Sequence, residues 1–415
     1  MTPLGGLSVN LETVREQFPA LREKTFLDAA CVSLAPRVAV QAISSFLDMA
    51  LWCPERSSTL HHIAMDDLRL NARREIARFI HAREDEVALV ESTTHGLNII
   101  AEALPLERGA HVLLCDLEFM EVALPWCQKR DRGEIEIDVV TNRRGEIRVE
   151  DIAAHIAPLT KVVAISSVQW SNGYRVDLKA LGKICRDAGV WLVVDAIQQL
   201  GAFPIDLLET PVDFLACGGH KWLNAPFGQG FLYVRREVLP RLRRPLTGYL
   251  SLEPPEDGWG NYFQTPSITP VRDYRFVEEA RLFEIGGTAN YPGAVGLAAC
   301  IKLLNDLGPP QVAARILGLT DQLIAGLSRI NVELVTPPAP KNRSGIVTFT
   351  LGSPQRNLSL MEYLLDHKVL VSVRYTSGVG GVRVSCHFFN SAEDVEQLLE
   401  LTAEFIRGRG GSVAT

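Results

Sequence analysis

The sequence predicts an α/β protein whose main sheet is mostly parallel, followed by a smaller α+β domain. Short, continuous apolar runs such as residues 191–194 and 214–217 are typical of strands buried on both faces of a parallel sheet. An amphipathic helix predicted over residues 178–188 leads into the first of these runs, which completes a βαβ unit. At 415 residues the chain is too long for one core of ordinary size, so we expect two domains.

The other elements follow from hydrophobic periodicity and from helix-capping and turn residues. Residues 9–20 form a predicted short helix capped by Asn10, and residues 38–82 are helical with a break near Cys53 and Pro54. Further strands of the main sheet are predicted at 87–90, 111–116, 135–140, 162–168 and 231–234. Helices over 294–306, 312–330 and 392–407, with short strands near 332, 345–351 and 369–373, form the smaller domain. Residues 245–275 are rich in Pro, Gly and aromatic side chains without periodicity, which is usual for a functional or disordered loop.

Composition excludes several classes of function. The chain is 47% apolar and 22% charged, with a net charge of −7, so it lacks the basic footprint of a nucleic-acid-binding protein. No apolar run is long enough to span a membrane, and Glu12 and Arg15 stand where a signal peptide would be apolar. We therefore expect a cytoplasmic protein. Its eight cysteines are scattered without C-x-x-C or zinc spacing, so we expect neither a disulfide nor a metal site.

Polar residues follow two of the predicted strands at the point where each strand ends. Asp195 closes the run 191–194, Gln198 comes three residues later, and His220 and Lys221 follow the run 214–217 after two glycines. Open α/β sheets bind ligands at the carboxyl ends of their strands. A lysine that can form a Schiff base and an acid that can hold a ring nitrogen protonated suit pyridoxal phosphate. Considered alone, Asp195 could simply be a solvated acid at the end of a core strand, and Lys221 a surface lysine after a glycine turn.

The order D-x-x-Q…G-H-K resembles the class V aminotransferase family, which includes cysteine desulfurases, selenocysteine lyases and isopenicillin N epimerase-like enzymes. The resemblance implies that Lys221 carries pyridoxal 5'-phosphate as a Schiff base and is the catalytic residue. It also implies that Asp195 pairs with the pyridine nitrogen and that Gln198 bonds the phenolic oxygen. His220 is expected to orient the cofactor or its phosphate.

Three other segments match cofactor-binding motifs of this family. The hydroxyl-rich turn 91–98 begins a predicted helix, whose free N–H groups suit a phosphate. By its resemblance to the family's phosphate-binding motif, the cofactor phosphate is expected to bind at Thr94 and His95. Phe119 stands where the family presents a ring that stacks on the cofactor, although a core phenylalanine is the competing interpretation. Thr288, in a segment that resembles F-E-x-G-T-x-N with one extra residue, is expected to reach the phosphate of the neighbouring subunit.

The substrate side of the site is predicted from three further segments. Ala29 and Ala30 belong to a segment similar to the family's YLD-x-A-A, where small residues allow close approach of the backbone to the bound amino acid. Asn172 is the assignment at the end of strand 162–168, although Gln169 and Ser171 remain open alternatives. Arg383 lies in a segment that resembles R-x-S…N, and its planar guanidinium is expected to clamp the substrate carboxylate.

The resemblance implies the fold type I arrangement of pyridoxal phosphate enzymes, with a seven-stranded, mostly parallel sheet in the large domain. Residues 1–24 are expected to form an N-terminal helix packed on the small domain. The large domain is predicted over 25–275 and the small α+β domain over 276–415. The family's shared cofactor contacts imply a homodimer with active sites at the interface. The expected substrate is a small molecule, an amino acid.

Two departures from the family pattern bear on the reaction. Gly218 replaces the serine that bonds the phosphate in many desulfurases, and residues 374–381 contain no cysteine where persulfide-forming desulfurases carry theirs. Cys31 could be a reactive thiol but is more simply a packing residue. We therefore expect a C–S or C–Se lyase that acts through an external aldimine without the usual persulfide cysteine. An epimerase, an aminotransferase or an enzyme forming C–C bonds remains open, whereas the intact motifs disfavour a cofactor-free scaffold.

Overall fold

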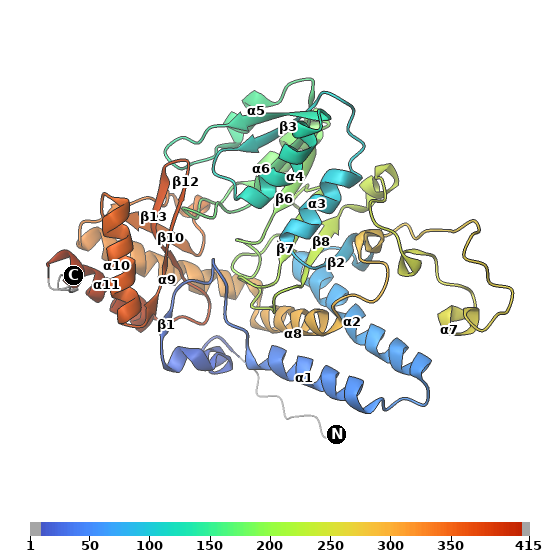
Figure 1. The fold of residues 1–415 in the computed structure, drawn as a ribbon. Helices are drawn as coiled ribbons and strands as arrows, with labels where there is room; N and C mark the ends of the chain where they lie inside the picture. The colour runs from blue at the N-terminus through green and yellow to red at the C-terminus, as the bar shows by residue number, and fades with distance from the viewer. Residues whose placement is uncertain (1–9, 409–415) are drawn as a thin grey trace.

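A seven-stranded sheet forms the centre of the computed structural model, which describes residues 10–408 (Figure 1). Its strand order is β2-β8-β7-β6-β5-β3-β4, and only β8 runs antiparallel to both of its neighbours within this sheet. The prediction of a mostly parallel seven-stranded sheet is therefore confirmed. The strands are β2 (Val87–Val90), β3 (Ala110–Cys115), β4 (Ile135–Val140), β5 (Thr160–Ser166), β6 (Trp191–Asp195), β7 (Phe214–Gly218) and β8 (Gly230–Val234).

Helices cover both faces of this sheet, which explains why its central strands are apolar throughout. In β6, Val193 packs in one buried cluster with α3 (Thr93–Ala103) and α4 (Met120–Asp131). Leu192 and Val194, on the opposite face, pack in a second cluster with residues of α2 (Ser58–Ile80), α5 (Val149–His155), α6 (Leu178–Ala188) and α8 (Tyr291–Leu307). Alternate side chains of a strand point to opposite faces, so both faces of β6 contribute to the core.

The helix break predicted near Cys53 is also present. α1 (Arg37–Trp52) ends at Cys53, which has a φ of 42° and donates its backbone N–H to Met49. This left-handed cap reverses the chain into α2, and both helices pack against α8. In Figure 1 these three helices lie together along the lower side of the molecule.

A four-stranded antiparallel sheet forms a second core near the C-terminus, in the order β12-β13-β10-β9. Its strands are β9 (Glu333–Leu334), β10 (Ile346–Thr350), β12 (Ser372–Thr376) and β13 (Val379–Ser385), and its helices are α9 (Pro309–Arg329), α10 (Pro354–Asp366) and α11 (Ala392–Ile406). Buried residues such as Val347, Val384 and Leu398 form a cluster separate from those of the large sheet. The chain thus has the two kinds of core that the sequence indicates.

The N-terminal segment differs from its prediction. It consists of two 3-10 helices, η1 (Val14–Gln17) and η2 (Pro19–Arg22), rather than one α-helix over 9–20, and residues 1–9 lie outside the described part. Pro19 disfavours α-helical angles at the residue before it, and Phe18 adopts φ −119° and ψ 81°. Arg15 pairs with Asp394 at 2.7 Å, which ties the segment to α11.

The short strand β1 (Thr25–Phe26) joins the C-terminal part of the chain rather than the large sheet. It pairs in parallel with β11 (Val369–Leu370), and Asp28 bridges to Ser385 of β13. Residues 25–28 are therefore attached to the smaller sheet. The domain boundaries 1–24, 25–275 and 276–415 stay predictions.

Residues 245–275 form an extension with little regular structure. It contains η5 (Tyr249–Ser251) and the single-turn helix α7 (Gly258–Tyr262), which lies at the right-hand edge of Figure 1. The remaining short elements are η3 (Glu84–Glu86), η4 (Arg236–Arg241), η6 (Ala280–Phe283) and η7 (Pro340–Asn342). Within residues 10–408, no helix combines the length and the apolar character needed to cross a bilayer.

Candidate active site

Asp195 lies at the carboxyl end of β6, with 4% of its surface exposed. Its Oδ1 accepts a hydrogen bond from the backbone N–H of Ile197 at 2.9 Å. Burial raises the pKa of Asp195 to about 7, against the opposing effects of that hydrogen bond and of Lys221. A buried carboxyl of this kind is poised to ionise when a cation approaches it.

Lys221 follows the adjacent strand β7 and lies beside an aromatic ring. Its Nζ is 5.6 Å from the ring centroid of Phe119, and Phe119 in turn packs edge-on against Trp170 at 5.1 Å between centroids. Burial lowers the pKa of Lys221, which Asp195 partly opposes. The amine is therefore easier to deprotonate than an exposed lysine, as a Schiff-base former or general base requires.

The amide of Gln198 is fixed by two buried contacts. Its Oε1 accepts from the indole N–H of Trp222 at 2.8 Å, and its Nε2 donates to the carbonyl of Ala30 at 3.1 Å. An indole N–H can only donate, so Trp222 determines which end of the amide is oxygen. The second N–H of Nε2 is left for another acceptor. Ala30 and Ala29 are both buried, which places the predicted small-residue segment against Gln198.

The start of α3 adjoins the end of β7. Ser92 caps the helix by accepting from the N–H of His95, and Thr93 Oγ1 accepts from the N–H of Gly218 at 2.8 Å. Thr94 is exposed at this end, and His95 pairs with Glu91. The first N–H groups of a helix lack intrahelical partners, so this end of α3 can receive an anion.

His220 stacks on Phe227, with ring centroids 5.1 Å apart and planes inclined by 19°. Burial lowers the pKa of His220 to about 4, and Lys221 adds to the effect. The imidazole is thus neutral at pH 7. A Cβ on Gly218 would lie 3.2 Å from Thr93 Oγ1 and 3.4 Å from His220 Nδ1, so the glycine leaves little room there for the serine of other family members.

Arg383 is buried on β13 with 1% of its surface exposed. Its Nη1 donates to the carbonyl of Trp170 at 3.0 Å and its Nη2 to Asp28 at 3.2 Å, whereas its buried Nε has no partner. Burial lowers the pKa of Arg383, and Asp28 opposes the shift. Because Arg383 Nε has no partner and Asp28 only partly neutralises the guanidinium, Arg383 can bind a further anion such as a carboxylate.

Both ends of the Asn172 side-chain amide are engaged within the protein, which disagrees with its predicted substrate role. The side chain is fully buried; its Nδ2 donates to the carbonyl of Gly145 at 2.7 Å, and its Oδ1 accepts from the N–H of Tyr174 at 3.0 Å. Both ends of the amide therefore brace the turn after β5. Gln169 is engaged as well, since it donates to Glu118 at 3.1 Å, whereas the buried hydroxyl of Ser171 has no partner.

Thr288 is exposed in the loop before α8. The loop is anchored on both sides. Glu284 accepts from Arg69, from Arg73 at 2.8 Å and from the N–H of Leu89 at 2.9 Å, and Asn290 donates to the carbonyl of Gly228 at 2.8 Å.

Two groups of functional interest were missed by sequence reasoning. Glu118, directly before Phe119, accepts from the N–H of Ser166 at 2.9 Å and bonds the side chains of Ser166, Gln169 and Cys115. Burial raises its pKa despite these bonds. Its position just after a predicted strand, where ligands bind in open α/β sheets, could have identified Glu118 as a candidate site residue.

The second missed group is Arg374, which donates from Nη2 to Cys31 Sγ at 3.6 Å. No sequence pattern indicates a cation beside Cys31, because the two residues are 343 positions apart. Arg374 lies on β12 opposite Gly381, two residues beyond Ser372, which is opposite Arg383. The two arginines therefore share one face of the smaller sheet.

The turn between β12 and β13 contains no thiol. The strands pair up to Thr376 and Val379, and the two residues between them, Ser377 and Gly378, have φ values of 46° and 76°. Positive φ at both positions is typical of a tight type I′ hairpin. Ser377 Oγ donates to the carbonyl of Asp116 at 2.7 Å, which attaches this turn to the end of β3.

The comparison with protein families identifies the family to which the chain belongs. Residues 25–398 match the sequence model described as aminotransferase class-V. The chain belongs to the class V aminotransferase family. The resemblance drawn from D-x-x-Q…G-H-K is therefore confirmed, and the chain is an enzyme of this family.

Individual class V aminotransferase relatives agree over almost the whole chain. A probable cysteine desulfurase of Methanothermobacter thermautotrophicus is 29% identical, over 96% of this chain and 98% of its own. The apo structure of a cysteine desulfurase from Thermococcus onnurineus has a TM-score of 0.84 at 27% identity, covering 96% and 98% of the two chains. A complex of the cystine C–S lyase C-DES with cysteine persulfide has a TM-score of 0.83 at 24% identity, covering 94% and 99%. That last likeness supports the fold alone.

The residues of the site fit the pyridoxal phosphate that the class V aminotransferase resemblance implies. The start of α3, where Thr94 is exposed, suits a phosphate. Buried Asp195 suits a protonated ring nitrogen, and Lys221 has the lowered pKa of an amine in a poorly hydrated pocket. The uncommitted Nε of Arg383 lies on the smaller sheet, where a substrate carboxylate would complete its bonds. The site thus has separate groups for the cofactor and for the substrate.

Proposed function

We propose that the protein is a pyridoxal phosphate-dependent lyase that cleaves the C–S or C–Se bond of an amino acid by β-elimination. The observation that carries the proposal is the combination of an intact cofactor and carboxylate site with the thiol-free hairpin at Ser377 and Gly378. A desulfurase that transfers sulfur as a persulfide needs a thiol close to the substrate sulfur. Elimination does not need one.

Five residues would hold the cofactor. Thr94 and His95 at the start of α3 would receive the phosphate, and neutral His220 would border the same end. Asp195 would face the ring nitrogen, where the positive charge would draw its pKa down from about 7 and keep it ionised. The free N–H of Gln198 would face the phenolic oxygen. Bound in this way, pyridoxal phosphate supplies an electron sink for bonds broken at Cα.

Lys221 and Arg383 would position the substrate and move its proton. The unpartnered Nε of Arg383 would complete a bidentate grip on the α-carboxylate. Lys221, whose pKa is lowered by burial, can accept the Cα proton at neutral pH. Phe119 covers Lys221 with a ring that cannot exchange protons, so Lys221 is the base for this step.

The overall reaction breaks the Cα–H and Cβ–S bonds of the substrate, and water then replaces the amine at Cα to give the keto acid and ammonia. With cysteine and water, the products are hydrogen sulfide, pyruvate and ammonia, and with cystine one product is a persulfide. No external oxidant or reductant is needed. Transfer of sulfur to an enzyme thiol would instead leave alanine, because the two electrons of the C–S bond would remain with the carbon skeleton.

Arg374 supports a substrate with a second negative group. It makes no ion pair among residues 10–408, its Nη1 donates only to the carbonyl of Val373, and its Nη2 contacts Cys31. Because it lies on the same face as Arg383, an amino acid held by Arg383 could extend its side chain towards Arg374. Cystine, whose distal half carries a carboxylate, fits this arrangement.

We further propose a homodimer in which Thr288 of each subunit reaches the phosphate of the other. Thr288 is exposed although it follows an anchored motif. Large apolar side chains are also exposed along α1 and α2, among them Trp52 at 77% and Leu51 at 71%. Exposed apolar surface of this kind marks an interaction site.

Product analysis tests the proposed reaction. Purified holoenzyme is incubated with cysteine and with cystine, and pyruvate and alanine are quantified for the wild type and for a Cys31→Ser variant. We expect pyruvate as the carbon product in both proteins. Alanine that disappears in Cys31→Ser would make Cys31 a sulfur acceptor, with Arg374 as its cationic neighbour, and would refute the elimination. Exchange of the α-proton without any turnover of sulfur compounds would favour an epimerase.

A further inference from the structure

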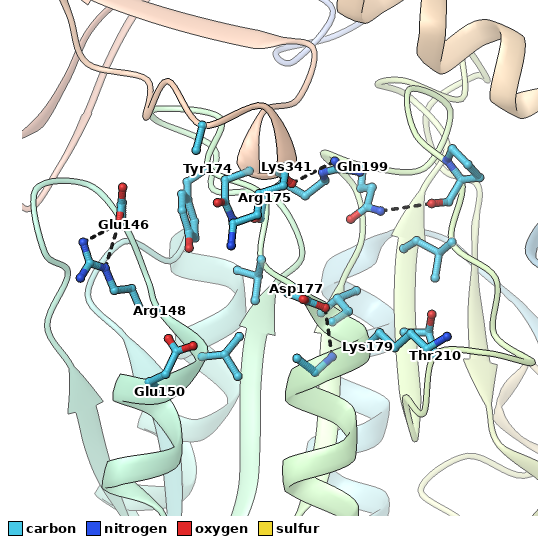
Figure 2. A pocket seen from close by; sticks show the side chains of 18 of the residues that line it. Glu146, Arg148, Glu150, Tyr174, Arg175, Asp177, Lys179, Gln199, Thr210 and Lys341 are labelled. Carbon is cyan, nitrogen blue, oxygen red and sulfur yellow. Dashed lines mark hydrogen bonds and ion pairs between the residues drawn. The ribbon is translucent and has the colours of Figure 1, made fainter.

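A polar cavity of about 530 Å³ lies outside the site described above. It is lined by the segments that precede α5 and α6, by the chain that follows β6, and by η7 near the smaller sheet. Figure 2 shows Tyr174, Arg175 and Gln199 along its upper edge, with Glu150 and Asp177 below them at the starts of the two helices. The proposed reaction uses none of these side chains.

Arg175 is a cation of this cavity without a counter-ion. Its Nη2 donates to the carbonyl of Lys341 at 3.0 Å and its guanidinium carbon lies 5.0 Å from the ring centroid of Phe203. Its Nε is buried without a partner, and the guanidinium makes no ion pair within residues 10–408. Burial lowers the pKa of Arg175, with Asp177 opposing. A desolvated charge in this state is stabilised by an anion that binds it.

Gln199 has an acceptor without a donor, whereas Arg175 has a donor without an acceptor. The side chain is 95% buried, since its exposed fraction is 5%; its Nε2 donates to the carbonyl of Pro204 at 3.3 Å, and its buried Oε1 has no partner. A buried acceptor without a donor destabilises the fold, and a ligand that donates to it would remove this cost. Two residues that line the cavity therefore carry an unsatisfied donor, Arg175 Nε, and an unsatisfied acceptor, Gln199 Oε1.

The charged side chains that remain free have both signs. Arg148 is engaged by Glu146 at 2.8 Å and Lys179 by Glu209 at 2.9 Å, and His81 pairs with Asp206 at 2.8 Å. After these pairs are set aside, Arg175 and Lys341 are left as cations, and Glu150 and Asp177 as acids. Asp177 uses one oxygen to cap α6 by accepting from the N–H of Ala180 at 3.0 Å, so its other oxygen is free.

We propose that this cavity is a second binding site, for a free zwitterionic amino acid. The carboxylate of the ligand would bind Arg175 and Lys341, and its ammonium group would be held between Gln199 Oε1 and Asp177. Inorganic phosphate and a simple carboxylate satisfy only the first of these requirements. The site joins the chain after β5 and β6 to η7, and Gln199 directly follows Gln198 of the candidate active site.

Calorimetry on the holoenzyme tests the proposal with three probes: L-alanine, propionate and inorganic phosphate. Binding at Lys221 is followed separately through the visible absorbance of the cofactor. We expect L-alanine to give a heat of binding without a parallel change in absorbance, and to bind more than tenfold more tightly than propionate or phosphate. Arg175→Gln should weaken this event at least tenfold and leave the absorbance titration unchanged. Arg186→Gln, a change at an exposed arginine of α6 outside the cavity, is the matched control.

Asp177→Asn provides a second variant that keeps the fold, because asparagine caps a helix as well as aspartate does. It should weaken the binding of L-alanine and leave that of propionate unchanged. Equal affinities for all three probes would refute recognition of an ammonium group. An unchanged alanine heat in both Arg175→Gln and Asp177→Asn, or no heat beyond the event seen in absorbance, would refute the site.

Discussion

Replacing Asp195 by asparagine should stabilise the cofactor-free protein while weakening its hold on pyridoxal phosphate. Burial raises the pKa of Asp195 from the ordinary value of 3.8 to about 7, so ionising this carboxyl costs more in the folded than in the unfolded chain. At pH 8 the shift corresponds to about 4 kcal/mol. Asparagine has the same shape and avoids this cost, because it carries no charge at any pH.

The pH dependence gives this prediction its sign. An acid with a raised pKa in the folded state contributes its full stability below pH 3.8, and that stability is lost as the pH rises through about 7. The advantage of Asp195→Asn should therefore be about 2–3 kcal/mol larger at pH 8 than at pH 5. Loss of the carboxylate opposite the ring nitrogen should at the same time weaken cofactor binding.

Urea unfolding of the cofactor-free wild type and variant at pH 5 and pH 8 measures the first effect, and titration with pyridoxal phosphate measures the second. Asp195→Glu serves as a control that keeps the charge. A difference between wild type and Asp195→Asn that does not change with pH would refute the reasoning, since it would mean that Asp195 is ionised in the folded protein at both values.

Three further predictions concern charged groups of the site and its supports. Arg383→Ala should weaken the binding of amino acids by about 2 kcal/mol or more relative to their decarboxylated amines, and equal losses for both ligands would exclude a carboxylate clamp. Arg374→Gln should raise KM for cystine more than for cysteine, whereas a parallel change would remove its role at the distal carboxylate. Burial would raise the pKa of Glu284, but Arg73 and Arg69 lower it. Glu284→Gln should therefore leave two arginines without their acid and destabilise the protein by about 3 kcal/mol, which would lower the urea midpoint of unfolding. An unchanged midpoint would show that the charges of these arginines are compensated elsewhere.

The sequence predicted the central sheet well because its strands are buried on both faces. Continuous apolar runs such as 191–194 arise only where each side chain has a hydrophobic neighbour, so they mark strands with little ambiguity. The prediction of a helix over 9–20 was wrong because Pro19 disfavours helical angles at Phe18, although the hydrophobic periodicity continues across both residues.

The site was predicted where chemistry and strand position coincide, and was missed where contacts join distant parts of the chain. Asp195 is the last residue of β6 and Lys221 comes three residues after the adjacent, parallel β7, so topology alone brings them to one edge of the sheet. The contact between Cys31 and Arg374 depends on the pairing of β1 with β11, and no local pattern reports such a pairing. Asn172 has a residue type suited to ligand binding, but its side chain fills the bonds of a buried turn.

Mapping the lysine that carries the cofactor tests the central claim most directly. The purified protein is saturated with pyridoxal phosphate, its visible absorbance is recorded, and it is then reduced with borohydride, digested and analysed by mass spectrometry. We predict an absorbance typical of a protein-bound Schiff base and a pyridoxyl group on Lys221, both lost in Lys221→Ala. A pyridoxyl group on another lysine, or no visible absorbance at saturating cofactor, would contradict the account.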